Sequence, residues 1–296
     1  MRLYQRKSVL LLSVVSICLL MLFSGCTQSK AEVPKPAPFD LPETTVPYTI
    51  QEMPITIEDR YIYGKAYLPQ DGNKTHPTVI LAHRMGGSLF HTEAFSMRFA
   101  EHGIAAYAFD FCGGGDNQSS GDMLSMSVKT EADDLKEVIR FVKEQSFVSP
   151  GSLFLLGQSQ GGYVCTMCAG EKSSDLAGLI LMYPAFNIND LTEEIVSKDG
   201  GIPETGVIFD QTVSHIYFED ALAEAIEEDM KHTELPVLIL HGSNDPVVPP
   251  AYSEQASRLF PHASFHLIQD AEHGFFGPQT DEAFTYCTDF ITKCLN

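Results

Sequence analysis

The sequence predicts an α/β protein whose central, mostly parallel sheet carries helices on both faces. The first observation is a series of short, uninterrupted apolar runs, which fit strands buried on both faces of a parallel sheet. These runs occupy residues 77–83, 103–111, 152–157, 177–184 and 236–242. The second is the set of helix-period segments between the runs, because alternating strands and helices build an open sheet that is covered on both sides. With 44% hydrophobic and 20% charged residues, the 296-residue chain has the composition of a globular protein.

The N-terminal 26 residues have the pattern of a secretion signal. Basic residues precede a mostly apolar run from 8 to 23, and "LFSGC" then resembles a bacterial lipobox ending at Cys26. Lipidation of Cys26 would anchor the mature protein to the bacterial cell membrane, outside the cytoplasm. An uncleaved membrane anchor is the alternative, and it gives the same location. Residues 27–47 hold five prolines without apolar periodicity, which predicts an extended tether.

Residues 48–296 are predicted to form a single domain. Residues 53–69 alternate in polarity and contain a turn signal, which indicates an antiparallel hairpin at the sheet edge. Residues 130–143 have apolar side chains at helical spacing from Leu135 onward, with Thr130 as the expected N-cap.

One long interval breaks the alternation of strands and helices. About fifty residues separate the run ending near residue 185 from the run starting at 236, and an unstructured loop of that length is unusual in a compact domain. The interval therefore predicts a cap inserted at about 187–234, between the sixth and seventh strands. Residues 218–232 have a helical pattern within it.

Charge and cysteine content exclude several classes of partner. The formal net charge of −20 repels nucleic acid and anionic lipid, so neither is an expected partner, and membrane contact is expected only through the N-terminal lipid. Cys165 and Cys168 form a C-x-x-C pair on a predicted helix. Without a second pair at zinc-like spacing, they are interpreted as small packing residues, with redox or metal chemistry as the alternative.

Ser159 is the candidate nucleophile. It lies in "GQSQG", where a buried-type strand ends and a helix begins. A sharp strand-to-helix turn would hold the side chain up, and the flanking glycines would let strand and helix approach closely. Because G-x-S-x-G also occurs by chance, a hydroxyl in a glycine-rich turn is the alternative.

A base and a carboxylate follow in the order that such a site needs. A serine hydroxyl requires an imidazole within hydrogen-bond reach, and the imidazole requires a carboxylate. Asp245 and His273 each follow a predicted strand, acid first and histidine second. Asp270 is the second choice for the carboxylate, since it lies too close to His273 in sequence to reach its ring easily. A turn role for Asp245 and a surface role for His273 are the alternatives.

Two backbone N–H groups are candidates for stabilising a developing oxyanion. One belongs to Gln160, directly after the serine, and the other to Met85 in "AHRMGGS" at 82–88. Gly86 and Gly87 of that loop are alternatively plain turn residues.

The domain resembles the α/β-hydrolases, in particular the bacterial cinnamoyl and feruloyl esterases. The resemblance is carried by "LAHRMGGS", "FDFCGGGDNQSSGD", "GQSQGG", "HGSNDPVV" and "AEHGF". It implies Ser159, Asp245 and His273 as the triad and Met85 and Gln160 as the oxyanion donors. Arg84 departs from the family, which commonly has glycine there.

The sequence therefore predicts a serine carboxylesterase that needs neither metal nor organic cofactor. The family resemblance implies hydroxycinnamoyl esters as substrates, with short-chain acyl esters second. An acyltransferase, a thioesterase or a peptidase of the same fold remains open, because the triad sets acyl chemistry and the pocket sets the acceptor. A surface lipoprotein that binds acylated glycans without turning them over is the alternative outside enzymes.

Overall fold

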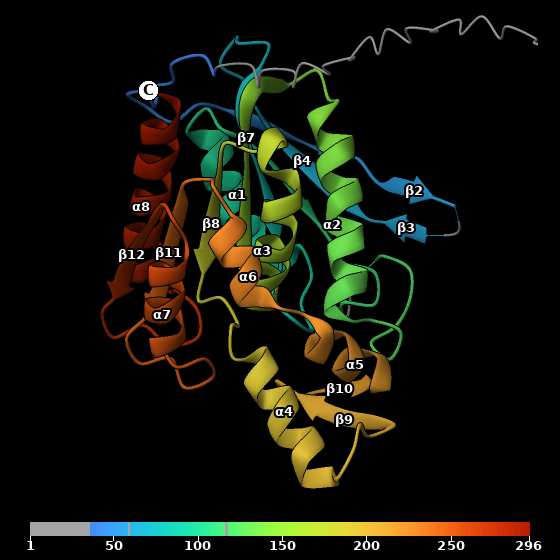
Figure 1. Ribbon diagram of the computed structural model, residues 1–296. Helices are drawn as coiled ribbons and strands as arrows, with labels where there is room; N and C mark the ends of the chain where they lie inside the picture. The colour runs from blue at the N-terminus through green and yellow to red at the C-terminus, as the bar shows by residue number, and fades with distance from the viewer. Residues whose placement is uncertain (1–35, 59, 116–117) are drawn as a thin grey trace, which may run out of the picture. The chain divides into compact units, whose positions relative to one another are not determined.

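An eight-stranded sheet forms the centre of the protein (Figure 1). The computed structural model describes residues 36–58, 60–115 and 118–296. The spatial order of the sheet is β1-β4-β6-β5-β7-β8-β11-β12. Strand β4 is antiparallel to both of its neighbours, β1 and β6, and all other neighbouring strands are parallel. The strands are β1 (Tyr48–Glu52), β4 (Gly64–Pro69), β5 (His76–Ala82), β6 (Ala105–Phe109), β7 (Val148–Gln158), β8 (Gly178–Met182), β11 (Val237–Gly242) and β12 (Ala263–Ile268). The predicted, mostly parallel sheet is confirmed.

Helices cover both faces of this sheet, as predicted, and each face has its own apolar core. Helices α1 (Phe90–Glu101) and α8 (Pro278–Leu295) pack on one face. Helices α2 (Val128–Lys143), α3 (Gln160–Lys172) and α7 (Ala251–Leu259) pack on the other. A short 3-10 turn, η1 (Ser173–Asp175), follows α3. Successive side chains of a strand point to opposite faces of the sheet. A strand that is buried on both faces is therefore an unbroken apolar run in the sequence.

The N-terminal hairpin is divided differently from the prediction. Strand β1 pairs with β4 at the sheet edge, while β2 (Ile55–Ile57) and β3 (Arg60–Ile62) form a separate two-stranded ribbon. The expected span of 53–69 thus omits β1. The alternating pattern locates strands but does not say which sheet they join.

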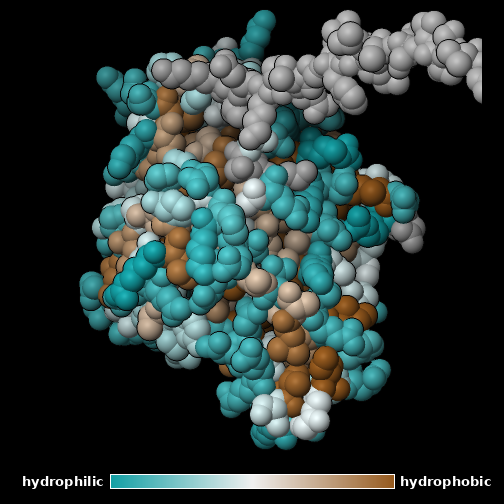
Figure 2. Space-filling view, in the orientation of Figure 1, coloured by the Kyte–Doolittle hydropathy of each residue, from teal (hydrophilic) through white to brown (hydrophobic). Residues whose placement is uncertain are grey.

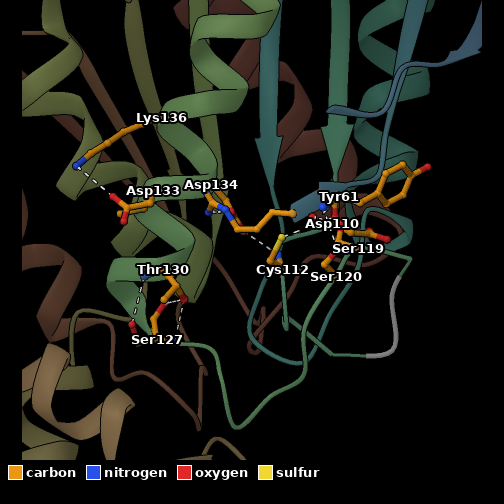
Figure 3. A network of polar contacts seen from close by, with 12 residues as sticks. Tyr61, Asp110, Cys112, Ser119, Ser120, Ser127, Thr130, Asp133, Asp134 and Lys136 are labelled. Atoms are coloured by element: carbon orange, nitrogen blue, oxygen red, sulfur yellow. Dashed lines mark hydrogen bonds and ion pairs between the residues drawn. The ribbon is translucent and has the colours of Figure 1, made fainter. Parts of the chain in front are cut away.

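Helix α2 begins earlier than the spacing of its apolar residues suggests. Its N-cap is Ser127, whose Oγ accepts from the backbone N–H of Thr130 at 3.2 Å. Thr130 Oγ1 accepts in turn from the N–H of Ser127 at 2.8 Å, which completes a capping box (Figure 3). Thr130 is therefore the third helical residue and not the N-cap.

The segment between β8 and β11, called the inserted segment below (residues 187–234), has secondary structure of its own. It lies between the sixth and seventh strands of the sheet in chain order. Its elements are α4 (Ile188–Asp199), β9 (Thr205–Ile208), β10 (Gln211–Ser214), α5 (His215–Ala223) and α6 (Ile226–His232). The predicted helical stretch at 218–232 is thus two helices, because the chain leaves helical geometry at residues 224 and 225. Figure 2 shows apolar surface on the inserted segment, whose exposed apolar side chains include Ile202 and Val207.

The described part of the N-terminal region lies against the domain. The backbone of Phe39 exchanges two hydrogen bonds with the side chain of Asn296, at 3.0 and 2.9 Å, and the N–H of Val46 donates to Glu101 O at 2.8 Å. Residues 36–47 of the predicted tether are thus attached to the domain. The signal segment 1–26 with Cys26, and residues 27–35, lie outside the described residues. Within the described residues, no helix combines the length and apolarity that a membrane crossing requires.

Candidate active site

Ser159 occupies the turn between β7 and α3. Strand β7 ends at Gln158 and α3 begins at Gln160, so the serine is the single residue between them. Its φ is 53°, a left-handed value that is costly for a residue with a side chain. The N–H of Ser159 donates to Met182 O at 3.0 Å, which ties the turn to the neighbouring strand β8. The surrounding structure therefore holds a strained backbone at the candidate nucleophile.

The glycines on either side of Ser159 are required by close backbone contacts. A Cβ on Gly157 would lie 2.3 Å from Gly161 O, and a Cβ on Gly161 would lie 2.5 Å from the carbonyl oxygens of Ala82 and His83. Both neighbours are backbone atoms that a side-chain rotation cannot move. The end of β5 and the first turn of α3 can touch only because position 161 is glycine.

Replacing Gly161 with alanine is expected to destabilise the fold by about 3 kcal/mol, the cost of overpacking against atoms that cannot yield. The midpoint of guanidinium unfolding measures this change. Gly201→Ala is the matched control, because a Cβ there meets nothing within 4 Å. Equal midpoints for the two variants would contradict this view of the turn.

The structure brings the three predicted residues together from the ends of three strands. His273 Nε2 lies 2.8 Å from Ser159 Oγ, and His273 Nδ1 lies 2.7 Å from Asp245 Oδ2. The ionised carboxylate is acceptor-only, so Nδ1 carries the proton and Nε2 is free to accept from the serine hydroxyl. Asp270, the second choice, is exposed in the turn after β12, where its N–H donates to Ser243 Oγ at 2.8 Å.

Asp245 is held as a charged group by a shell of donors. Its Oδ1 accepts from the N–H groups of Val247 and Val248, both at 2.9 Å. Burial raises the pKa of Asp245, but hydrogen bonds from His241, His273 and the Val248 N–H outweigh burial and keep the pKa well below the usual carboxyl range. The carboxylate is thus ionised wherever the domain is folded at ordinary pH.

A second histidine, His241, contacts Asp245 and was not predicted from the sequence. Its ring is fully buried, with Nε2 3.1 Å from Asp245 Oδ2 and 2.9 Å from Val248 O. Its Nδ1 lies 2.7 Å from Ser253 Oγ, and this second hydrogen bond fixes the orientation of the ring. The only signal in the sequence is a polar residue near the end of the apolar run 236–242.

Both candidate oxyanion donors lie on backbone segments next to Ser159. Gln160 is the first residue of α3, so the helix itself supplies no acceptor for its N–H. Met85 is buried in the turn after β5, in which the N–H of Gly87 donates to Arg84 O at 3.0 Å and Gly86 has a φ of 63°. Gly86 and Gly87 are therefore turn residues, and the turn they make carries Met85.

Two polar side chains, His83 and Asp110, hold the loop after β5 in place. His83 accepts from the N–H of Phe111 at Nε2 (3.0 Å), and its Nδ1 donates to Arg84 O (2.7 Å). Burial lowers the pKa of His83 to about 4, so the ring is neutral and both hydrogen bonds persist. Asp110 Oδ1 accepts from the N–H of Leu89 at 2.6 Å, which ties the far end of the loop to the end of β6.

The loop after β6 is pinned by a further buried carboxylate (Figure 3). Asp134 of α2 accepts from the N–H of Cys112 at 2.8 Å and from Arg60 Nη1 at 2.6 Å. Ser119 Oγ donates to the carbonyl of Asp110 at 2.6 Å. This glycine-rich loop is thus held by carboxylates and hydroxyls on the protein's own side chains.

Arg84 and the C-x-x-C pair lie outside the triad, and two phenylalanines closely follow His273 in the chain. Arg84 is exposed, with Nη2 3.1 Å from His91 Nε2. Phe275 is buried edge-on against Tyr183, and Tyr183 contacts the His273 ring in the same way at 4.9 Å, whereas Phe276 is 76% exposed. Cys165 and Cys168 are buried on α3, where Cys168 Sγ donates to Ala132 O at 3.4 Å.

The inserted segment reaches the site through two side chains. A Cβ on Gly86 would lie 2.8 Å from the Gln211 side chain of β10, so Gln211 rests on the turn that carries Met85. The Tyr217 hydroxyl of α5 donates to Gln160 Oε1 at 2.7 Å. Ser159 is only 3% exposed in this arrangement. A cavity of about 390 Å³ between α4, α6 and α7 does not include it.

Two family models match the chain. The model described as "Serine aminopeptidase, S33" matches residues 73–202, and the model described as "alpha/beta hydrolase fold" matches residues 205–278. Together they span the sheet from the start of β5 to the loop that carries His273.

The relatives matched by sequence are distant, since the two described here are 25% identical to this chain. The protein YfhR of Salmonella typhimurium is 25% identical over 207 residues, which are 66% of this chain and 64% of YfhR. Dipeptidyl aminopeptidase BIII of Pseudoxanthomonas mexicana is 25% identical over 209 residues, 65% of this chain and 28% of the peptidase. The chain thus spans less than two thirds of the length of either relative.

The solved structure of Est1E from Butyrivibrio proteoclasticus with bound ferulic acid superposes with a TM-score of 0.73. The two chains are 21% identical, and the match covers 81% of this chain and 99% of Est1E. At this identity the likeness concerns the fold.

Proposed function

The chain is an α/β-hydrolase, and from this premise we propose that it hydrolyses carboxylic esters through an acyl-enzyme on Ser159. The observation that supports the proposal most strongly is the position of His273, whose two ring nitrogens lie 2.8 Å from Ser159 Oγ and 2.7 Å from Asp245 Oδ2. An imidazole that bridges a hydroxyl and a buried carboxylate is the arrangement that activates a serine.

The proposed reaction has two halves. Ser159 Oγ attacks the ester carbonyl while His273 Nε2 takes the hydroxyl proton, and the N–H groups of Gln160 and Met85 donate to the oxyanion. His273 then delivers the proton to the leaving alcohol, which leaves the acyl group on Ser159. Water, deprotonated by His273, attacks the acyl-enzyme, and His273 returns the proton to Ser159 Oγ as the bond to the acyl group breaks and the acid leaves. Asp245 holds the ring in the required tautomer and stabilises the imidazolium.

For the substrate we propose hydroxycinnamoyl esters, with short-chain acyl esters second. The sequence resemblance, the likeness to Est1E with ferulic acid and the presence of an inserted segment support this choice. A comparison of kcat/KM on methyl ferulate, methyl caffeate and p-nitrophenyl esters of two to twelve carbons tests it. Among the p-nitrophenyl esters, the short-chain esters are expected to exceed the twelve-carbon ester by about tenfold or more, since each misfitted group in a pocket costs about 1–3 kcal/mol, and both methyl hydroxycinnamates are expected to be hydrolysed. A preference for long chains would contradict the proposal.

A peptidase is the second candidate, because one family model is described as a serine aminopeptidase and one relative is a dipeptidyl aminopeptidase. Aminoacyl and dipeptidyl p-nitroanilides separate it from an esterase. A fluorophosphonate probe that labels the wild type but not a Ser159 variant would exclude a module that only binds acylated glycans. Transfer of the acyl group to added alcohols or thiols, measured alongside hydrolysis, would reveal an acyltransferase, and hydrolysis of acyl thioesters would reveal a thioesterase.

The signal-like N-terminus supports a further proposal, that the enzyme acts outside the cytoplasm on a lipid anchor at Cys26. Incorporation of a clickable palmitate analogue tests it, since labelling should disappear in Cys26→Ala.

A further inference from the structure

The side-chain amide of Gln160 is held from two sides by buried groups of other elements. On one side the Tyr217 hydroxyl of α5 donates to Gln160 Oε1 at 2.7 Å, and on the other Gln160 Nε2 donates to Glu131 Oε2 of α2 at 2.9 Å. The exposed fractions of these three residues are 0% for Tyr217 and Gln160 and 1% for Glu131. The amide therefore has one fixed orientation.

This fixed amide belongs to the residue whose backbone N–H is the proposed oxyanion donor. A preorganised donor is effective only when it points at the place where charge develops, and misplacement by a fraction of an ångström weakens it. Gln160 is at the first position of α3, where helix ends fray and only one side of the residue is held by helical hydrogen bonds. Side-chain hydrogen bonds to α2 and α5 supply the missing constraint.

We propose that Tyr217 and Glu131 are positioning residues, which clamp the Gln160 amide and so aim its N–H at the oxyanion. The inserted segment thereby influences the reaction through α5, whose Tyr217 contacts the residue that follows the nucleophile. The inference rests on the proposed function, because it assigns Gln160 to the same acyl chemistry.

Glu131 is suited to this role because it is a buried acceptor that forms no ion pair with any described residue. Burial raises its pKa to about 8, with the neighbouring Asp134 acting in the same direction and the hydrogen bond from Gln160 opposing it. The Tyr217 hydroxyl and the Cys165 thiol also face it, and the pKa of each is raised by burial and by the carboxylate. At neutral pH the acid is therefore mostly protonated, and one oxygen still accepts from Gln160. The other, Oε1, has no partner in the described residues.

Stability should follow the titration of Glu131. Its pKa is higher in the folded than in the unfolded chain, so its contribution to stability is full below about pH 4.5 and is lost as pH rises through about 8. Glu131→Gln removes the titration. The melting temperature of this variant minus that of the wild type is expected to increase from pH 5 to about pH 8 and to level off above it. Asp133→Asn, at an exposed position of the same helix, should show no such trend, and a flat difference for Glu131→Gln would contradict the buried titration.

The proposal is tested with Tyr217→Phe, which removes only the hydroxyl. The matched control is Tyr163→Phe, because the Tyr163 hydroxyl is a second link between α3 and the inserted segment. It donates to Asn189 Oδ1 of α4 at 2.9 Å, whereas the Gln160 amide is hydrogen-bonded to Tyr217 and Glu131. On p-nitrophenyl acetate, Tyr217→Phe is expected to lower kcat about tenfold with KM within twofold. Its affinity for phenylboronic acid, whose serine adduct places an oxygen in the oxyanion position, should fall by a similar factor. Tyr163→Phe should stay within twofold of wild type on all three quantities.

Glu131 provides the rescue experiment. Glu131→Gln keeps an oxygen acceptor for Gln160 and should retain kcat within about threefold, whereas Glu131→Leu lacks the acceptor and should lose about tenfold. In a Gln160→Leu background, Tyr217→Phe should have no further effect on kcat, because the clamp is already absent. Thermal unfolding of each variant checks that the domain is folded.

The outcomes separate the inference from the proposed function. A wild type without esterase activity would refute the function. An active wild type in which Tyr217→Phe equals Tyr163→Phe, or in which the Tyr217 effect persists in the Gln160→Leu background, would overturn the clamp alone. A change confined to KM would also overturn it, because an oxyanion donor acts in the transition state.

Discussion

Replacing Ser159 with alanine is expected to lower kcat on p-nitrophenyl acetate by about 10⁴- to 10⁶-fold, the loss seen when the nucleophile of a serine hydrolase is removed. The fold should be unaffected, because the hydrogen bond of the Oγ atom among the described residues is to the His273 ring and alanine keeps the backbone strain of the turn unchanged. Steady-state rates with burst analysis measure the effect, and the circular dichroism spectrum tests the fold.

Ser152→Ala is the matched control for this experiment. Ser152 lies on the same strand, β7, and its buried Oγ has no hydrogen-bond partner in the described residues. It should keep wild-type turnover and fluorophosphonate labelling. A Ser159→Ala enzyme that turns over within tenfold of wild type would refute the acyl-enzyme on this residue.

Asp245→Asn is expected to lower kcat by about 10³- to 10⁴-fold, through the histidine tautomer. The N–H groups of Val247 and Val248 both donate to Oδ1, so the asparagine oxygen must occupy that position. The NH₂ group then takes the place of Oδ2 and donates to His273 Nδ1. A ring that accepts at Nδ1 carries its proton on Nε2 and cannot take the proton of Ser159.

Asp270→Asn distinguishes the two carboxylates that the sequence offers. Asp270 is exposed and has a left-handed φ of 57°, which asparagine tolerates, so this variant should stay within twofold of wild type. A larger loss of kcat for Asp270→Asn than for Asp245→Asn would contradict the assignment of the carboxylate.

The convergence of the three predicted site residues has a simple physical basis. Ser159, Asp245 and His273 each follow a predicted strand, and the carboxyl ends of parallel strands meet at one edge of a sheet. Identifying the strands was therefore enough to bring together residues that are 86 and 28 positions apart in the chain. The choice of Asp245 over Asp270 rested instead on distance along the chain, since Asp270 lies only three residues before His273.

Features that depend on pairing between distant segments could not be found in this way. The alternation in residues 53–69 is equally consistent with one hairpin or with two separate strand pairs. Only the folded structure shows that β1 pairs with β4 at the sheet edge while β2 pairs with β3. The break between α5 and α6 is similar, since the apolar spacing continues across a point at which the backbone leaves the helix.

The sequence by itself determined the layered α/β architecture, the strand-to-helix turn at Ser159 and the order of acid and base. These properties follow from the local periodicity of apolar residues and from the residue types that come directly after strand ends. The tertiary structure alone decided which buried polar groups meet. His241 reaches Asp245, and Glu131 and Tyr217 reach Gln160, across elements whose sequences show only a polar residue in an apolar context. Such contacts arise because a buried polar group must find a partner in three dimensions, and no spacing along the chain records which partner it finds.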